Sequence, residues 1–326
     1  MILSLIAIVA GLALLVWSAD HFVEGATSIA KHLGASTLII GITIIGFGTS
    51  APEILVSVIA VLEDTPDIAI GNALGSNIAN IGLILGVTAF VTPVPIVSEL
   101  IRRELPLLLL ATVIMAWCLV DGTVDLFDAA LLLGTLIIML WYLVKSHRQS
   151  PDFDAEEKKL EKSLPAEMSL SKALIWSVFG LAVLVGSSKL LIWGATNVAV
   201  ALGVSELIIG LTIIALGTSL PELAASLSSL KKGVPDMAIG NVIGSNLFNS
   251  LAVIGIPATF KSFEFHASAI TRDLPVVAGF TLLLFCFAMY PRTAARSITR
   301  VKGLWLLCGF VIYELYLYYE VTTGIT

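Results

Sequence analysis

Residues 41–86 read GITIIGFGTSAPEILVSVIAVLEDTPDIAIGNALGSNIANIGLILG, and residues 210–255 repeat them as GLTIIALGTSLPELAASLSSLKKGVPDMAIGNVIGSNLFNSLAVIG. The offset is 169 residues without a gap, and 21 of the 46 aligned positions are identical. The identical positions include these polar or proline pairs: Thr49/Thr218, Ser50/Ser219, Pro52/Pro221, Glu53/Glu222, Ser76/Ser245 and Asn77/Asn246. A duplicated set of carboxylates, hydroxyls and amides inside apolar segments indicates a pathway for cations rather than a packing interface.

The repeat extends upstream and downstream of this stretch. Residues 5–40 match residues 174–209 at the same offset, with 19 of 36 positions identical, and RELP at 103–106 aligns with RDLP at 272–275. Because the N-terminal segment recurs in mid-chain and lacks a basic leader, we expect it to be a retained helix and not a signal peptide.

The composition is that of an integral membrane protein. Hydrophobic residues make up 57% of the chain and charged residues only 13%, whereas soluble domains contain roughly a quarter charged residues. The mean hydropathy is +0.99. Since a spanning helix needs about 20 apolar residues, the sequence predicts an all-α membrane protein with ten transmembrane helices. We expect them at residues 2–30, 36–62, 67–92, 104–120, 126–145, 170–200, 205–230, 236–260, 273–290 and 302–320.

The ten predicted helices divide into two halves of five. We expect an N-terminal repeat at 1–146, a charged cytoplasmic linker at 147–169 and a C-terminal repeat at 170–326. An odd number of helices forces the second half to enter the membrane in the opposite orientation, so the two five-helix repeats are predicted to be inverted.

The distribution of basic residues predicts the orientation. With both termini outside, 15 of the 18 Lys and Arg residues fall in inner loops or the linker, as the positive-inside rule requires. We therefore expect a multi-pass protein of a prokaryotic inner membrane. The outer loops carry Glu63, Asp64, Asp67, Asp121, Asp125 and Asp128, which are either a solvated face or a rim that concentrates cations.

The GTSAPE (48–53) and GTSLPE (217–222) motifs predict irregular helices. Pro52 and Pro221 have no N–H to offer the carbonyl groups of Gly48 and Gly217, four residues earlier, and the proline ring crowds that turn. We expect a kink and free carbonyl oxygens near the middle of the membrane, which is tolerated only where the backbone is buried in protein or lines a cavity.

Helical spacing gathers the polar side chains of each motif on one side of its helix. Thr49, Ser50 and Glu53 are spaced by three or four residues, as are Thr218, Ser219 and Glu222. On the next helix of each half, the pairs are Ser76 with Asn80 and Ser245 with Asn249. Inverted symmetry would bring the two glutamates together at the midplane. The asparagines at 72, 77, 241 and 246 are either ligands or interhelical hydrogen-bonding groups, and the glycines at 71, 75, 240 and 244 serve either helix packing or close approach to the ion path.

Such a site would contain only oxygen ligands. Hard cations suit it: calcium takes about six to eight oxygens, whereas soft metals favour Cys or His, which the motifs lack. Two facing carboxylates repel each other when both are ionised in a medium of low dielectric constant. One divalent cation, two monovalent cations or two protons would neutralise them, which is the physical basis for exchange.

These paired G-T-S-x-P-E and G-N-x-x-G-S-N motifs resemble those of the sodium/calcium exchangers of the calcium/cation antiporter superfamily, over nearly the whole chain, and the short linker is similar to that of the prokaryotic members. The resemblance implies a calcium site formed by Glu53, Glu222, Thr49 and Thr218. It also implies flanking sodium sites from Ser50, Ser219, Ser76, Ser245, Asn80 and the carbonyl groups of Gly46 and Ala215. One position departs from the family pattern: Asn249, opposite Asn80, is often Asp in well-studied exchangers.

The sequence thus predicts a secondary antiporter that exports Ca²⁺ against Na⁺ by alternating access, with the lipid bilayer as its surroundings. We expect no cofactor, no nucleic acid and no obligate protein partner. Exchange coupled to H⁺ or K⁺ is the alternative within this class, and a passive cation channel is the alternative outside it. An intramembrane hydrolase is disfavoured because the sequence contains neither HExxH nor GxSxG.

Overall fold

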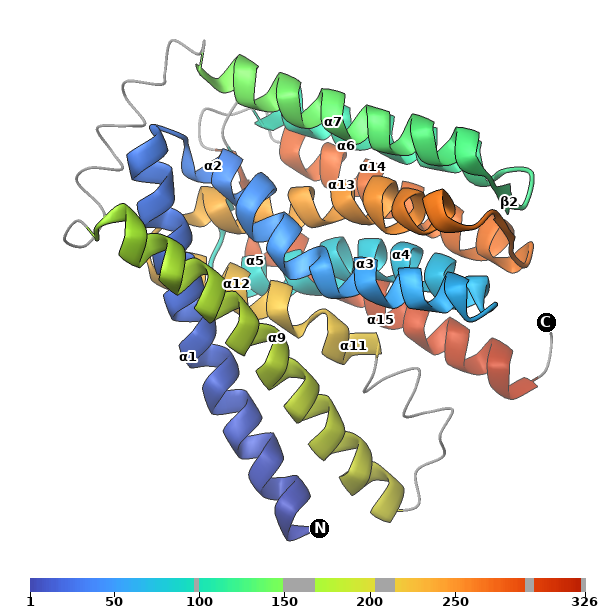
Figure 1. Cartoon of the computed structure of the whole chain (residues 1–326), viewed down its shortest axis with the longest axis horizontal. Helices are drawn as coiled ribbons and strands as arrows, with labels where there is room; N and C mark the ends of the chain where they lie inside the picture. The colour runs from blue at the N-terminus through green and yellow to red at the C-terminus, as the bar shows by residue number, and fades with distance from the viewer. Residues whose placement is uncertain (97–99, 149–167, 203–214, 291–295, 324–326) are drawn as a thin grey trace.

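The protein is a bundle of apolar helices. The computed structural model describes residues 1–96, 100–148, 168–202, 215–290 and 296–323 (Figure 1). Within these residues, eight helical stretches are long and apolar enough to cross a membrane: Ile2–Leu33, Thr37–Leu62, Pro66–Val91, Leu126–Ser146, Leu170–Ala201, Pro235–Phe260, Ala269–Met289 and Arg300–Glu320. Their length and composition confirm a predominantly helical membrane protein.

The elements follow one another along the chain in this order. The α-helices are α1 (Ile2–Leu33), α2 (Thr37–Ile40), α3 (Gly46–Leu62), α4 (Pro66–Ala79), α5 (Gly86–Val91), α6 (Leu105–Leu119), α7 (Leu126–Arg148), α9 (Leu170–Ala201), α11 (Ala215–Thr218), α12 (Leu220–Lys231), α13 (Pro235–Phe260), α14 (Leu274–Met289) and α15 (Arg300–Thr323). The π-helical segments are η1 (Gly41–Ile45), η2 (Asn80–Leu85), η3 (Leu100–Glu104) and η5 (Ala269–Asp273). Two short antiparallel pairs, β1 (Val94–Pro95) with β4 (Ser297–Ile298) and β2 (Thr123–Val124) with β3 (Phe263–Glu264), join loops from the two halves.

Two of the ten predicted spans are not among the eight stretches. The span predicted at 104–120 corresponds to α6, a 15-residue helix that continues from the charged segment η3. The span predicted at 205–230 lies partly outside the described residues, and its described part consists of α11 and α12. Most of the predicted linker also lies outside the described residues. The number ten therefore stays a prediction.

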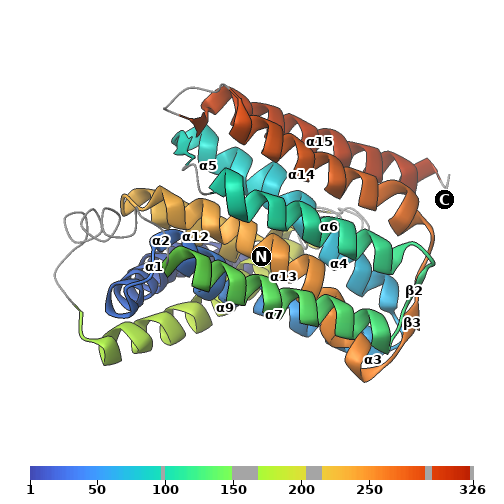
Figure 2. The same cartoon turned by 90° about the horizontal axis from the view of Figure 1, so that it is seen from above.

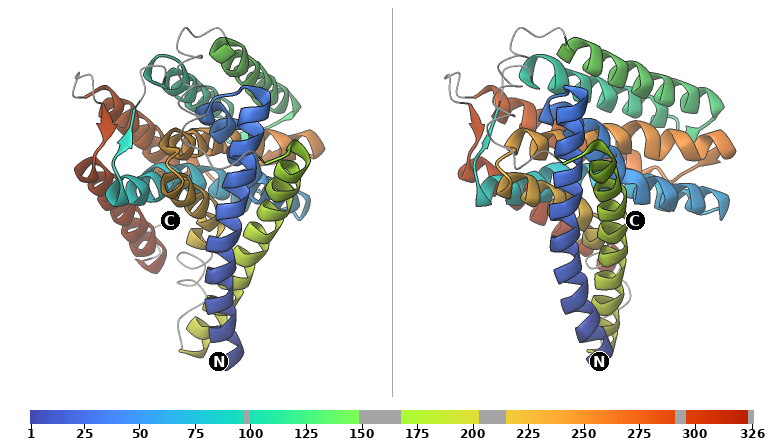
Figure 3. Two further views of the ribbon diagram at one scale, coloured as in Figure 1. Left: turned by 90° about the vertical axis from the view of Figure 1, so that its left-hand side faces the viewer. Right: turned by 60° about the vertical axis from the view of Figure 1, so that its left-hand side comes forward.

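The helices α1 and α9 run antiparallel and extend from the bundle as a two-helix arm (Figure 3). Glycines let them approach closely. A Cβ atom at Gly11 would lie 3.0 Å from the backbone nitrogen of Leu191, and one at Gly180 would lie 2.8 Å from that of Phe22. Gly180 is the repeat equivalent of Gly11, and Leu191 is the equivalent of Phe22, so the same contact occurs twice with the two helices exchanged.

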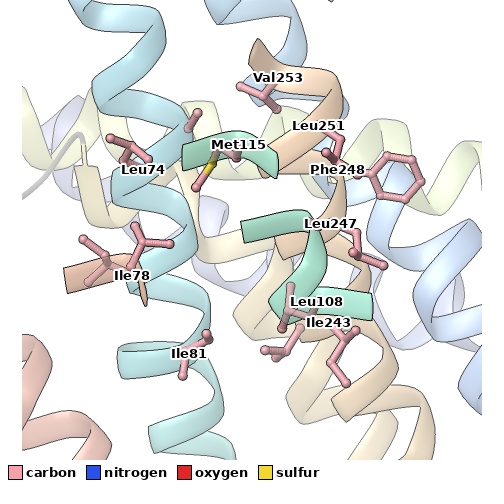
Figure 4. Close-up of a cluster of buried hydrophobic side chains, with 14 of the residues drawn as sticks. Leu74, Ile78, Ile81, Leu108, Met115, Ile243, Leu247, Phe248, Leu251 and Val253 are labelled. Carbon is pink, nitrogen blue, oxygen red and sulfur yellow. The ribbon is translucent and has the colours of Figure 1, made fainter. Parts of the chain in front are cut away.

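The centre of the bundle is α13, which packs against α3, α4, α6 and α7 and is buried along almost its whole length (Figure 2). Apolar side chains of α4, α6 and α13 interlock beside it, including Leu74, Leu108, Met115, Leu247 and Leu251 (Figure 4). Because this hydrophobic core takes side chains from both halves of the sequence, each half depends on the other for burial.

Two glycines of α13 form the crossing with α2, η1 and the start of α3. A Cβ atom at Gly240 would lie 2.5 Å from the carbonyl oxygen of Leu38, and one at Gly244 would overlap the backbone of Ile42. The helix-packing interpretation is therefore confirmed for these two positions. Their repeat equivalents on α4, Gly71 and Gly75, have no described atom within 4 Å of an added Cβ. Among the described residues, no helix therefore packs closely against these two glycines.

Gly244→Ala should destabilise the protein by about 2–3 kcal/mol, because rigid backbone occupies the space of the new methyl group. The matched change Gly75→Ala should be nearly neutral or slightly stabilising, because alanine favours the helix. The apparent melting temperature of each variant in detergent measures the difference. Equal melting temperatures for the two variants would show that the α3–α13 crossing is not tight.

Candidate cation-binding site

Thr49 lies where α3 crosses α13. Its hydroxyl donates to the carbonyl oxygen of Ile45 at 3.0 Å and lies 3.3 Å from Asn241 Oδ1 and 3.4 Å from Ser245 Oγ. The side chain is fully buried. A polar residue of the first motif therefore contacts two polar residues of the second half directly.

The two asparagines that follow the GTSxPE motifs make equivalent hydrogen bonds. Asn72 Nδ2 donates to the carbonyl oxygen of Glu53 at 3.1 Å and to Ser57 Oγ at 3.0 Å. Asn241 Nδ2 donates to the carbonyl oxygen of Glu222 at 3.1 Å and to Ser226 Oγ at 2.9 Å. Each asparagine thus ties the glutamate's helix to the next one. The amide groups of Asn72 and Asn241 therefore make the interhelical hydrogen bonds that were one of the two alternatives for these residues.

The carboxyl groups of Glu53 and Glu222 both lie in the interior. Both residues are 2% exposed. The two carboxylates interact electrostatically, and the Thr49 hydroxyl lies within hydrogen-bonding reach of Glu222. Two carboxylates this deeply buried repel each other and lose hydration, so a charged pair is stable only with a compensating cation or proton.

Several oxygen atoms of this region have no hydrogen-bond partner among the described residues. They are Ser50 Oγ, Glu53 Oε2, Glu222 Oε2, Asn77 Oδ1, Asn246 Oδ1 and Asn249 Oδ1. Buried oxygen atoms normally have a hydrogen-bond partner. A set of unpaired oxygens from carboxylate, hydroxyl and amide groups is the kind of ligand set that a hard cation prefers. No group of three or more His, Cys, Asp or Glu side chains that could hold a metal ion occurs in the described part of the chain.

The other predicted site residues lie on the same elements or next to them. Ser76 in α4, Asn80 at the start of η2, Ser219 between α11 and α12, and Ser245 and Asn249 in α13 are all buried. Gly46 is buried at the first residue of α3, and Thr218 is partly buried. Ala215 begins α11, and only its backbone is described.

The two proline motifs differ in their local structure. The helix α3 runs unbroken from Gly46 to Leu62 with Pro52 inside it, whereas the second copy ends one helix at Thr218 and begins the next at Leu220. Pro221 therefore occupies the first turn of α12, where its missing N–H costs no hydrogen bond within α12. The predicted irregularity therefore takes the form of a helix break in the second copy only.

Comparison with known proteins identifies the family. The family model described as sodium/calcium exchanger protein matches residues 3–145 and 172–319. The chain belongs to the sodium/calcium exchanger family. Members of this family are transporters, so the protein is a membrane antiporter and not an enzyme.

Full-length relatives agree with this membership. The chain is 44% identical to the putative antiporter CaxA of Alkalimonas amylolytica, covering 98% of this chain and 99% of the relative. It is 38% identical to the inner membrane protein YrbG of Escherichia coli, with 98% of each chain covered. Among solved structures, the sodium-calcium exchanger NCX_Mj soaked without Na⁺ and Ca²⁺ matches with a TM-score of 0.81 at 33% identity, over 97% of this chain and 99% of that one.

Asn241→Ala should lower the free energy of unfolding by about 1–3 kcal/mol, because it leaves the Glu222 carbonyl group and the Ser226 hydroxyl without their common donor. Asn72→Ala should act in the same direction. The control is Asn197→Ala, whose amide bonds only the Trp193 carbonyl group of its own helix in an exposed position. Thermal unfolding in detergent measures the stability of all three variants. If Asn241→Ala were as stable as Asn197→Ala, Asn241 would not tie α12 to α13.

Proposed function

We propose that this protein exports Ca²⁺ in exchange for Na⁺ by alternating access at an all-oxygen site near the middle of the membrane. The observation that carries the proposal is the pair of buried glutamates: Glu53 and Glu222 interact electrostatically, and each keeps one carboxylate oxygen without a partner among the described residues. One calcium ion would balance their charge, and so would two sodium ions.

The proposed calcium ligands are Glu53, Glu222, Thr49 and Thr218. The proposed sodium ligands, or supports of those ligands, are Ser50, Ser219, Ser76, Ser245, Asn80, Asn249 and the carbonyl groups of Gly46 and Ala215. The unpaired oxygens of Ser50 and Asn249 and the contact between Thr49 and Ser245 support this assignment. So does the family, because the related exchanger NCX_Mj has been soaked with Na⁺, Ca²⁺ and Sr²⁺.

We further propose that the chain forms two inverted five-helix repeats, at 1–146 and 170–326, joined by a cytoplasmic linker at 147–169. The antiparallel packing of α1 and α9 supports the inversion, since equivalent glycines make equivalent contacts with the two helices exchanged. The duplicated hydrogen bonds of Asn72 and Asn241, one set within each half, support the structural repeat. Both termini would face outward, as the basic-residue bias predicts, and an inner membrane location agrees with the relative YrbG.

Alternating access follows from the charge of the site. An empty site with two ionised carboxylates is costly in a low-dielectric interior, whereas a site loaded with one calcium or two sodium ions is neutral. The carrier would therefore change its orientation readily when loaded and poorly when empty, which couples the outward and inward fluxes. A passive channel would not need this dependence on occupancy.

Coupling to protons is a second candidate for the driving ion. Its support is the neutral pair Asn80 and Asn249, which leaves the two glutamates as the only carboxylates among the proposed ligands. Two protons neutralise two carboxylates as well as two sodium ions do. Calcium flux in proteoliposomes under imposed sodium, proton or potassium gradients separates these candidates, because only the coupled gradient drives calcium uphill.

Glu53→Gln and Glu222→Gln should each abolish calcium exchange while the protein still inserts and folds, because each removes half of the compensating charge and keeps the shape. Calcium should also raise the melting temperature of the wild type and not of these variants. The control is Glu264→Gln, at the exposed residue of strand β3. Normal calcium flux in either glutamate variant would contradict the proposed site.

Asn249→Asp should favour binding of one more monovalent cation, because a third negative charge lets the site hold a third sodium ion without net positive charge. The Hill slope of calcium efflux against sodium concentration should increase, measured at fixed pH and clamped membrane potential. A slope equal to that of the wild type, or smaller, would show that this position does not set the number of ions.

A further inference from the structure

The carbonyl group of Gly217 makes an unusual contact. Pro221 follows it by four residues and has no N–H, so this carbonyl cannot accept the usual helical hydrogen bond. Ser188 of α9 provides the missing donor: its hydroxyl donates to the Gly217 carbonyl oxygen at 2.7 Å, and the side chain is 3% exposed. The arm helix α9 is thereby bonded to the backbone of the GTSLPE motif.

The first half has no hydroxyl at the equivalent position. The repeat equivalent of Ser188 is Ala19, which is buried on α1. Phe22, one turn further along α1, lies 3.3 Å from the Cβ position of Gly48, so this part of α1 faces the first motif. Alanine cannot donate to the Gly48 carbonyl group, and α3 continues unbroken there.

The serines next to these positions show that a hydroxyl on α1 or α9 does not by itself reach the motif. Ser187 and Ser18 are repeat equivalents, and each donates to a carbonyl oxygen of its own helix, Ser187 to Leu184 at 2.9 Å and Ser18 to Leu14 at 2.6 Å. Such bonds within one helix do not link the arm to the motif. Of these two adjacent positions, 188 differs between the halves and 187 does not.

The other helix of the arm, α1, is attached to α12 by other groups. Asp20 of α1 accepts hydrogen bonds from Lys231 at 2.5 Å and from Ser228 at 2.7 Å, near the end of α12 and away from the proposed ligands. The two helices of the arm are therefore held differently: α1 by charged groups at the far end of α12, and α9 by a buried hydrogen bond within the motif.

We infer that Ser188 is a positioning residue that fixes the Gly217 backbone at the break between α11 and α12, and so links the position of α9 to the geometry of Thr218, Ser219 and Glu222. The inference rests on the proposed function and deepens it. Because Ala19 makes no matching bond, the link stabilises the orientation of the proposed carrier in which Ser188 meets Gly217 over the opposite orientation. Calcium would then bind with different apparent affinity from the two faces of the membrane.

The test compares Ser188→Ala with Ser187→Ala, a matched loss of a buried hydroxyl on the same helix. The apparent KM for calcium is measured separately from each face of reconstituted protein. Ser188→Ala should change the ratio of the two KM values by about twofold to tenfold, the range of one net hydrogen bond, with a smaller effect on maximal rate. Ser187→Ala should leave the ratio unchanged. Ala19→Ser, which offers the Gly48 carbonyl group a donor, should move the ratio in the opposite direction.

A second measurement does not depend on transport. Backbone hydrogen exchange of residues 215–222 should accelerate in Ser188→Ala and not in Ser187→Ala, because the segment loses its tie to α9. The inference is overturned if Ser188→Ala matches Ser187→Ala in both measurements, or if Ser188→Ala and Ala19→Ser shift the KM ratio in the same direction. If the wild type moves no calcium under any gradient, the proposed function fails, and hydrogen exchange alone then upholds or overturns the positioning role of Ser188.

Discussion

Two carboxyl groups buried inside an apolar bundle, each within the electrostatic field of the other, impose the main physical demand on this protein. Glu53 and Glu222 come from α3 and α12, are almost inaccessible to water, and repel each other when both are charged. Two like charges are stable in such an interior only when a cation or protons compensate them. The surrounding hydroxyls and amides supply further oxygen atoms, several without a partner among the described residues, so the arrangement fits ions that exchange with one another.

The helix α13 holds these groups in place. It crosses η1 and α3 at Gly240 and Gly244, where backbone lies against backbone, and this approach allows Thr49 to reach Asn241 and Ser245. Its Asn241 also ties down the carbonyl group of Glu222. A single buried helix thus supports both carboxylate-bearing elements, and the hydrophobic core beside it draws side chains from both halves of the chain.

The two halves are similar in sequence but unequal in structure. The first GTSxPE motif lies in one continuous helix, whereas the second is interrupted before its proline, next to the hydroxyl of Ser188. Gly240 and Gly244 are covered by backbone, while Gly71 and Gly75 meet no described atom. The proposed alternating access requires such a difference, because identical packing of the two halves would leave neither side of the site closed.

The repeat in the sequence determined the helical membrane class, the pairing of the motifs and the identity of the carboxylates, because an intramembrane glutamate at a duplicated position has few structural explanations. Helical spacing also grouped Thr49, Ser50 and Glu53 correctly on one helix. Only the tertiary structure decided that Asn72 and Asn241 act as interhelical ties, that one proline motif breaks its helix and the other does not, and that Ser188 meets Gly217. Spacing along one helix carries no information about which residue of another helix lies opposite, and a bond between positions 188 and 217 exists only once α9 has packed against the motif.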